Sequence, residues 1–163
     1  ILSFAVVFNS TLFFASYAYA ADDDATKAAL TSYEQVRAAL ASDNLDGAKQ
    51  AAATLMEQAA AIKNDPIATG ADALAKSSDL ETARKHFKTI SQGIIPLVKD
   101  KPGYYVIHCP MANASWVQTD KTVQNPYYGK AMFGCGDIQG NISSAKKAVP
   151  EMSAHGAGHG CCK

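Results

Sequence analysis

Residues 78–97 read SDLETARKHFKTISQGIIPL, and this stretch decides the fold. Apolar side chains recur along it in alternating steps of three and four, at Leu80, Ala83, Phe87, Ile90, Ile94 and Leu97. That spacing gathers them on one stripe of an α-helix, which is the seam of a helical bundle. Ser78 and Glu81 have the spacing of a capping box, so the helix is predicted to begin at Ser78. Pro96 predicts a kink or an early end in the last turns.

Further helices are predicted upstream, in a region rich in Ala, Lys, Glu, Asp and Gln. One spans about 24–42 and another about 45–63, each with apolar residues at helical spacing. Residues 67–76 predict a shorter helix of their own. Because the connecting turns are short, neighbouring helices are expected to be antiparallel. The predicted fold is mainly α: an antiparallel up-and-down bundle of three to four helices.

The pattern changes after Pro102-Gly103. Residues 104–107, YYVI, resemble a strand, and Gly, Pro, Asn and aromatic residues replace the Ala-rich text. All four cysteines lie beyond this point. Residues 104–138 are therefore predicted to form a small, irregular, β-containing appendage that carries Cys and Met. Residues 139–163 are predicted to be a flexible tail, so that the bundle and its metal-site segment occupy 21–138.

The first twenty residues, ILSFAVVFNSTLFFASYAYA, carry no charge and end in a small-x-small pattern. This pattern predicts a signal peptide over residues 1–20, truncated at its start and cleaved near Ala20-Ala21. A membrane anchor is the alternative, but polar residues interrupt the apolar run and acidic residues follow it. The mature protein is expected in the periplasm, or otherwise exported, without stable membrane insertion.

Charge and motifs exclude several classes of function. Fifteen basic residues balance fifteen acidic ones, which argues against a nucleic-acid binder. The sequence has no CxxC redox pair, no CxxCH haem attachment pattern and no convincing hydrolytic triad. An enzyme is therefore not expected.

Two short segments combine a thiol with a thioether: residues 108–111, HCPM, and residues 132–135, MFGC. Cys109 and Met111 are expected on a loop fixed by Pro110. Asn125 is expected to cap a helical turn that begins at Pro126, and the three-residue spacing brings the sulfurs of the second segment to one side of such a turn.

Together these segments predict a core metal site formed by Cys109, Met111, Met132 and Cys135. His108 is available to it as a nitrogen donor. Soft thiolate and thioether ligands favour Cu(I), and by the same chemistry Ag(I), over Zn(II).

Each of these residues also has a structural interpretation. Cys109 and Cys135 could form a disulfide, which is common in exported domains. Met111 and Met132 could fill gaps in the core. Trp116 could anchor the core, or its ring could cover a bound monovalent cation as a lid. From the residues alone, the choice between a metal site and a disulfide stays open.

Residues 104–138, YYVIHCPMANASWVQTDKTVQNPYYGKAMFGCGDI, resemble the signature of a bacterial exported domain family of unassigned function. The likeness is carried by CPM at 109–111, Trp116, NPYYG at 125–129, Met132 and CG at 135–136. The preceding helices are similar too. This family occurs alone or fused to adaptor proteins of copper and silver efflux pumps. The resemblance therefore implies copper binding and an efflux adaptor, or another periplasmic copper protein, as partner.

The tail ends in HGAGHGCCK, which places His155, His159, Cys161 and Cys162 close together among glycines. This composition predicts a flexible chelator for copper or zinc. The leading hypothesis is a periplasmic protein that binds Cu(I) or Ag(I) and buffers or transfers it in copper homeostasis or efflux. The alternative is a disulfide-fastened interaction domain that holds no metal and docks on an envelope or efflux partner through Tyr127-Tyr128.

Overall fold

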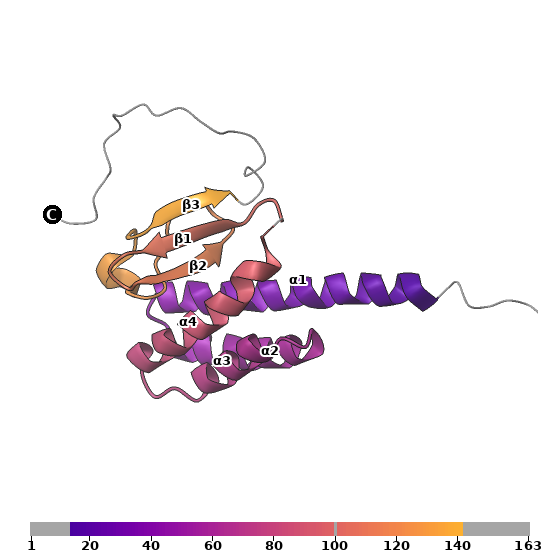
Figure 1. Cartoon of the computed structure of the whole chain (residues 1–163). Helices are drawn as coiled ribbons and strands as arrows, with labels where there is room; N and C mark the ends of the chain where they lie inside the picture. Colours follow the sequence, from indigo (N-terminus) through magenta and orange to yellow (C-terminus); the bar gives the residue numbers. More distant parts are fainter. Residues whose placement is uncertain (1–13, 100, 142–163) are drawn as a thin grey trace, which may run out of the picture.

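The structure is a computed structural model that describes residues 14–99 and 101–141. Its helices are α1 (Phe14–Ala41), α2 (Leu45–Ala61), α3 (Asp65–Ala75) and α4 (Leu80–Leu97). They precede strands β1 (Tyr105–Cys109) and β2 (Ala114–Gln118), the 3-10 helix η1 (Gly129–Met132) and strand β3 (Asp137–Asn141). Figure 1 shows the small sheet on one side of the bundle, next to α1 and α4, with α2 and α3 on the other side. The prediction of a mainly α bundle with a β-containing appendage is confirmed.

Side-chain caps define where the helices begin. Asn44 accepts a hydrogen bond from the Gly47 backbone at the start of α2, and Asn64 does the same for Ile67 at the start of α3. The N-cap of α4 is Asp79, so the predicted start at Ser78 was wrong by one residue.

The Asp79 carboxylate accepts from both the backbone N–H and the hydroxyl of Thr82, which leaves Ser78 only as a donor to Asp79. At the other end, α4 includes Pro96 and ends at Leu97, the last residue of the predicted apolar stripe, close to where a kink or an early end was predicted. α3 begins at Asp65, two residues before the predicted short helix, because Asn64 caps it and a proline occupies its first turn.

The N-terminal helix is longer than predicted. α1 begins at Phe14 and continues through Ala20-Ala21, where the signal peptide is expected to end. Residues 1–13, most of that predicted peptide, lie outside the described residues. Among the helices that the structure describes, none is long and apolar enough to cross a membrane.

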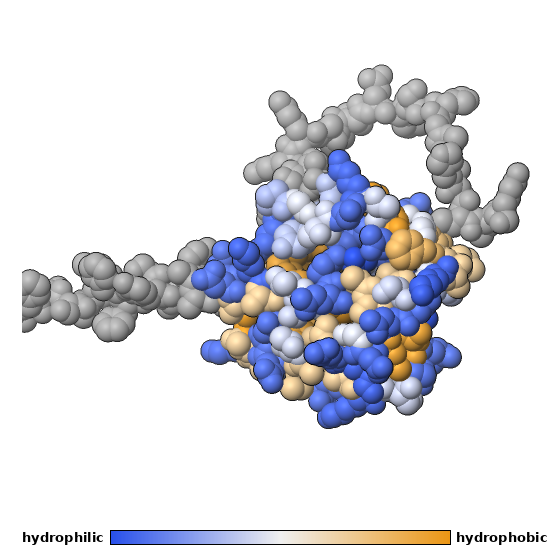
Figure 2. Space-filling model, turned by 180° about the vertical axis from the view of Figure 1, so that it is seen from behind, coloured by the Kyte–Doolittle hydropathy of each residue, from blue (hydrophilic) through white to orange (hydrophobic). Residues whose placement is uncertain are grey.

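The core lies between the helices and extends under the sheet. Tyr33, Leu40, Leu55, Leu74, Phe87 and Ile94 are among its fully or almost fully buried side chains. The view in Figure 2, from the side opposite to Figure 1, shows mainly hydrophilic side chains with smaller apolar patches between them. The apolar stripes of the helices therefore face one another, as the seam at 80–97 predicts.

The sheet is antiparallel with the order β2-β1-β3, so β1 is its central strand. β1 continues to Cys109, and the prediction that Cys109 lies on a loop was therefore wrong: it pairs with Ala114 of β2. β3 was not predicted, since Asp137–Asn141 has little β-branched or aromatic character. This strand crosses from the predicted appendage into residues 139–141, which the sequence assigned to the tail.

Two tyrosines cover the outer edge of β2. The Tyr33 hydroxyl accepts a hydrogen bond of 3.0 Å from the Val117 backbone, and the Tyr127 hydroxyl donates one of 2.8 Å to the Ser115 carbonyl. The rings stand in a row with Phe87 between them, at centroid distances of 5.3 and 5.7 Å. This row satisfies an edge that would otherwise expose unpaired backbone groups, and it joins the sheet to the bundle.

Candidate metal centre

Two cysteines that are 26 residues apart in the sequence meet at one end of the sheet. The Sγ atoms of Cys109 and Cys135 are 3.8 Å apart, and the two residues are 0% and 4% exposed. They are thiols, with no disulfide between them. The convergence of the two predicted segments is therefore observed for their cysteines.

The sulfur separation sets the geometry that an ion would find. If an ion lay about 2.3 Å from each sulfur, as in zinc–thiolate bonds, a separation of 3.8 Å would correspond to an S–metal–S angle of about 110°. A linear centre with the same bonds would need about 4.6 Å between the sulfurs. The pair therefore suits a centre with three or four ligands.

Cys109 owes its position to β1. Neighbouring residues of a strand point to opposite faces, so Cys109 and Ile107 share one face. Across the ladder, Ala114 and Trp116 pair with these two residues and lie on the same face. All four are buried, which makes the Cys109 thiol part of the apolar core.

Cys135 lies between η1 and β3, and Asn125 holds it there. The fully buried Asn125 side chain donates to the Cys135 carbonyl at 2.7 Å and accepts from the backbone N–H groups of Tyr127 and Tyr128. Its backbone N–H donates to the Phe133 carbonyl at 2.7 Å. Asn125 thus caps the predicted turn and also fixes the loop that carries the second thiol.

The glycine after Cys135 allows this loop to lie against the sheet. Gly136 has a φ of +154°. A Cβ atom there would lie 2.7 Å from both Ile107 and the Trp116 ring, closer than real Cβ contacts. Trp116 is fully buried, its indole N–H donates to Gln118, and its ring edge contacts Tyr127. The Trp116 ring therefore anchors the core beside the loop that carries Cys135. The predicted role of this ring as a lid over a bound cation would need the same position.

A cluster of charged groups docks the 124–130 loop on the bundle. Arg84 of α4 donates to the carbonyls of Pro126 and Leu40 and forms an ion pair with Asp43. Asp43 also accepts from the Lys130 backbone. Desolvation alone would raise the pKa of Asp43, but the hydrogen bonds from Arg84 and Lys130 outweigh it and hold that pKa below its ordinary value. A second arginine, the buried Arg37, donates to the Gln124 carbonyl.

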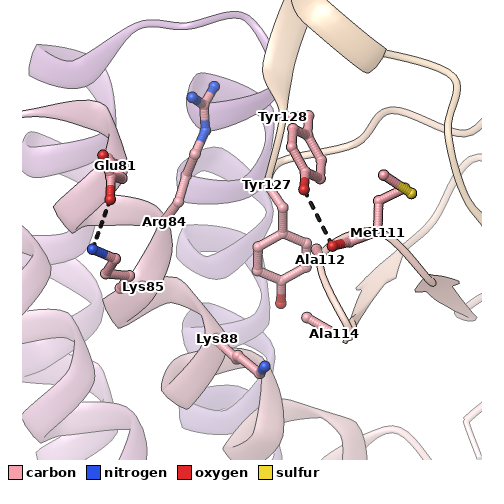
Figure 3. A pocket seen from close by; sticks show the side chains of 9 residues that line it. All are labelled: Glu81, Arg84, Lys85, Lys88, Met111, Ala112, Ala114, Tyr127 and Tyr128. Atoms are coloured by element: carbon pink, nitrogen blue, oxygen red, sulfur yellow. Dashed lines mark hydrogen bonds and ion pairs between the residues drawn. The ribbon is translucent and has the colours of Figure 1, made fainter.

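The two methionines of the predicted site have different surroundings. Met132 ends η1 and is half-buried against the core, and its backbone carbonyl accepts a hydrogen bond of 3.0 Å from the Cys135 N–H. Met111 is 55% exposed, two residues beyond Cys109. Figure 3 shows its sulfur turned away from Tyr127, while its carbonyl accepts from the Tyr128 hydroxyl.

His108 does not join the thiols. It follows Ile107 and precedes Cys109 on β1, so its ring lies on the other face of the sheet, where Nδ1 is 3.1 Å from the Ser115 hydroxyl. In the part of the chain that the structure describes, no three His, Cys, Asp or Glu side chains come together as a metal-holding group. His155, His159, Cys161 and Cys162 lie outside the described residues.

A groove of about 480 Å³ runs between α4 and the turn that carries Met111. Figure 3 shows Arg84, Lys85 and Lys88 on its α4 side and Tyr127 and Tyr128 opposite them. Burial raises the pKa of Tyr127; a hydrogen bond with Ser91 opposes this, and the charge of Cys109 adds to it. Tyr127 therefore stays protonated, and its hydroxyl donates to the Ser115 carbonyl of the sheet. Of the predicted docking pair, Tyr128 is the residue whose hydroxyl lies at the surface.

Sequence reasoning missed the residues that position the thiols. The NPYYG segment predicts a turn, but nothing local indicates that Asn125 binds Cys135 or that Gly129 faces Asp43. Arg84 and Asp43 are ordinary charged residues until the fold brings them together. A CG dipeptide after a turn is a signal for close backbone approach, although it does not identify Trp116 as the neighbour.

These features define a helical bundle with a buried thiol pair on an attached sheet. Residues 29–103 match the model of a family described as "Protein of unknown function (DUF3347)". The matched segment includes the second half of α1 and all of α2, α3 and α4, and it ends before β1. No curated protein and no solved structure matches the chain. The match supports the helical part of the resemblance, while the Cys and Met segment lies beyond it.

Proposed function

We propose that this chain is an exported protein that binds Cu(I), and also Ag(I), and buffers or transfers the ion in copper homeostasis or efflux. The observation that carries the proposal is the pair of buried sulfurs of Cys109 and Cys135 at 3.8 Å. Thiolates are strong ligands for soft monovalent ions. The apolar surroundings of the pair disfavour harder, more strongly hydrated ions.

Met132 is the third ligand in this proposal. It is half-buried in the same turn as Cys135, and an S–metal–S angle of about 110° leaves room for a thioether beside two thiolates. Thioether sulfur suits Cu(I) far better than Zn(II), which favours copper over zinc. The exposed Met111 meets the incoming ion first, and the tail residues His155, His159, Cys161 and Cys162 gather metal with less selectivity.

The partner is an efflux-pump adaptor or another periplasmic copper protein. A three-coordinate ion can accept a ligand from a partner before it loses one of its own, which permits transfer without release into solution. Met111 lies at the surface, two residues beyond Cys109 in the sequence, and such an exchange would begin there.

Titration of the reduced chain with Cu(I) against a competing chelator tests the proposal. Two matched variants separate the sites: a tail-serine chain with Cys161→Ser and Cys162→Ser, and a core-serine chain with Cys109→Ser and Cys135→Ser. We expect the tail-serine chain to keep one high-affinity ion and the core-serine chain to lose it, with folding checked by circular dichroism. Equal affinity in the two chains would contradict a core site.

The thioether has its own comparison. Met132→Leu keeps the apolar volume and removes the sulfur, and we expect a loss of about tenfold in Cu(I) affinity. Met56→Leu, at another half-buried methionine in α2, is the control and should change nothing. If the purified chain instead holds a Cys109–Cys135 disulfide and gains no metal affinity on reduction, the interaction-domain alternative is correct.

A further inference from the structure

The spacing of the thiol pair also suits a second chemical state. Disulfide sulfurs are about 2 Å apart, so the Cys109 and Cys135 sulfurs must approach by a little under 2 Å to bond. We propose that this pair is a redox switch on the metal site: two-electron oxidation to the disulfide expels the ion, and reduction restores binding. This inference rests on the proposed function.

The two cysteines are held with unequal firmness. Cys109 belongs to the central strand and pairs with β2, so its backbone is fixed by the ladder. Cys135 lies in the loop between η1 and β3. A Cβ atom on neighbouring Gly134 would find no heavy atom within 4 Å, and Phe133 is 42% exposed. The open flank at Gly134 leaves space on the Cys135 side of the pair, so we expect the Cys135 sulfur to make most of the approach while Asn125 still holds its backbone.

The same loop determines which sulfur an oxidant meets. Cys135 is 4% exposed and has the open flank at Gly134, whereas Cys109 is fully buried. Cys135 is thus the attacking thiolate and Cys109 the resolving one. The Asn125 hydrogen bond to the Cys135 carbonyl holds the loop at the separation that suits an ion.

The oxidant is a disulfide, of a protein or a small molecule. The Cys135 thiolate attacks one of its sulfurs, which breaks that S–S bond and releases the first thiolate. The Cys109 thiolate then attacks Cys135 in the mixed disulfide and releases the second. The pair has lost two electrons, the oxidant has gained them and takes up two protons as two thiols, and the ion leaves with its charge unchanged.

Metal binding and oxidation are linked, because the ion binds only the reduced pair. Loading must therefore make the pair harder to oxidise. Each tenfold excess of free ion over its dissociation constant makes oxidation tenfold less favourable, which raises the two-electron midpoint potential by about 30 mV.

The experiment uses the tail-serine chain, full length, so that only the core thiols remain. The probe is Ag(I), which keeps its charge in mild oxidant. Diamide serves as the oxidant because it takes up two electrons and two protons without leaving a thiol that would compete for silver. We measure bound silver by equilibrium dialysis, and the disulfide from the thiols that resist alkylation in mass spectrometry.

We expect one Cys109–Cys135 disulfide per chain, a loss of at least tenfold in Ag(I) affinity, and full recovery after reduction with a phosphine that is removed before silver is added again. Silver loading should raise the midpoint potential of the pair, by about 30 mV for each tenfold excess of free silver over its dissociation constant. As a control, Cys135→Ser should form no intramolecular disulfide.

Retention of silver after the disulfide has formed would overturn the switch, as would a pair that diamide leaves reduced without metal. Neither result contradicts the proposed function, which is tested separately by Ag(I) uptake of the reduced chain. If the reduced chain takes up no Ag(I), the proposed function fails and the switch fails with it.

Discussion

At the scale of the residue, Gly129 lies where the loop of the appendage meets the bundle. Its φ is +56°, and a Cβ atom there would overlap the Asp43 carboxylate and the Arg84 guanidinium. We expect Gly129→Ala to lower the free energy of unfolding by about 1–3 kcal/mol, through backbone strain and a displaced ion pair. Urea denaturation measures the loss.

Gly103→Ala is the matched control for this prediction. Gly103 also has a positive φ, +87°, but a Cβ atom there meets nothing within 4 Å. Gly103→Ala should therefore lower the free energy of unfolding only through backbone strain. If it lowered stability as much as Gly129→Ala, the 124–130 loop would not be packed closely against Asp43.

The Tyr127 hydroxyl gives a second residue-scale prediction. Tyr127→Phe keeps the ring beside Phe87 and Trp116 but leaves the Ser115 carbonyl without this donor. We expect a loss of about 1–3 kcal/mol in the free energy of unfolding. Tyr128→Phe removes an exposed bond to the Met111 carbonyl and should cost less than about 0.5 kcal/mol. Thermal unfolding of the two variants side by side makes the comparison.

Residue types predicted that the two cysteines meet, but not which side chains surround and position them. Cys109 and Cys135 were expected to converge, because thiols in an exported chain bind metal or pair, and they do lie together. His108 was grouped with them by sequence proximity, but alternation along β1 sends its ring to the other face. Asn125 acts through a contact with Cys135 that only the folded chain creates.

At the scale of the element, the 124–130 loop is tied to the bundle by Asp43 and Arg84, and this clamp should respond to acid. Since the pKa of Asp43 is lowered by folding, its contribution is fully present above the unfolded value, about 3.9, and is lost as pH falls through the lower folded value. Solvent screening limits that contribution to about 1 kcal/mol or less.

Asp43→Asn should therefore be less stable than the parent chain at neutral pH, and the difference should shrink as pH falls below about 4. Denaturation curves at a series of pH values measure this. Glu81→Gln, in the exposed pair with Lys85, serves as the control and should leave the stability almost unchanged. If the difference in the free energy of unfolding between the parent and Asp43→Asn grew as the pH fell, the Asp43 carboxylate would not be stabilising the fold in its charged form.

α2, α3 and α4 were predictable because they have local signals: apolar residues at helical spacing, Asn or Asp caps, and a proline near the end of α4. The start of α1 was not predicted. The sheet was harder, because it depends on long-range partners. β3 has little strand character of its own, and it forms because the central strand β1 offers it an edge. The extension of β1 to Cys109 likewise follows from pairing with Ala114.

At the scale of the whole molecule, metal binding to the native state must stabilise the fold. Ag(I) at 100 times its dissociation constant should add about 2.7 kcal/mol to the free energy of unfolding, if the unfolded chain binds it weakly. The melting temperature of the tail-serine chain should therefore rise with silver, measured by calorimetry, and that of the core-serine chain should not. A rise of the same size in both chains would place the binding outside Cys109 and Cys135.

The central claim is that two distant segments bring sulfur ligands to one ion, and X-ray absorption at the copper edge of the Cu(I)-loaded tail-serine chain tests it most directly. We expect a first shell of about three sulfur atoms, which disappears when Cys109 and Cys135 are replaced by serine. A first shell of nitrogen or oxygen, or a sulfur shell that survives both replacements, would contradict it.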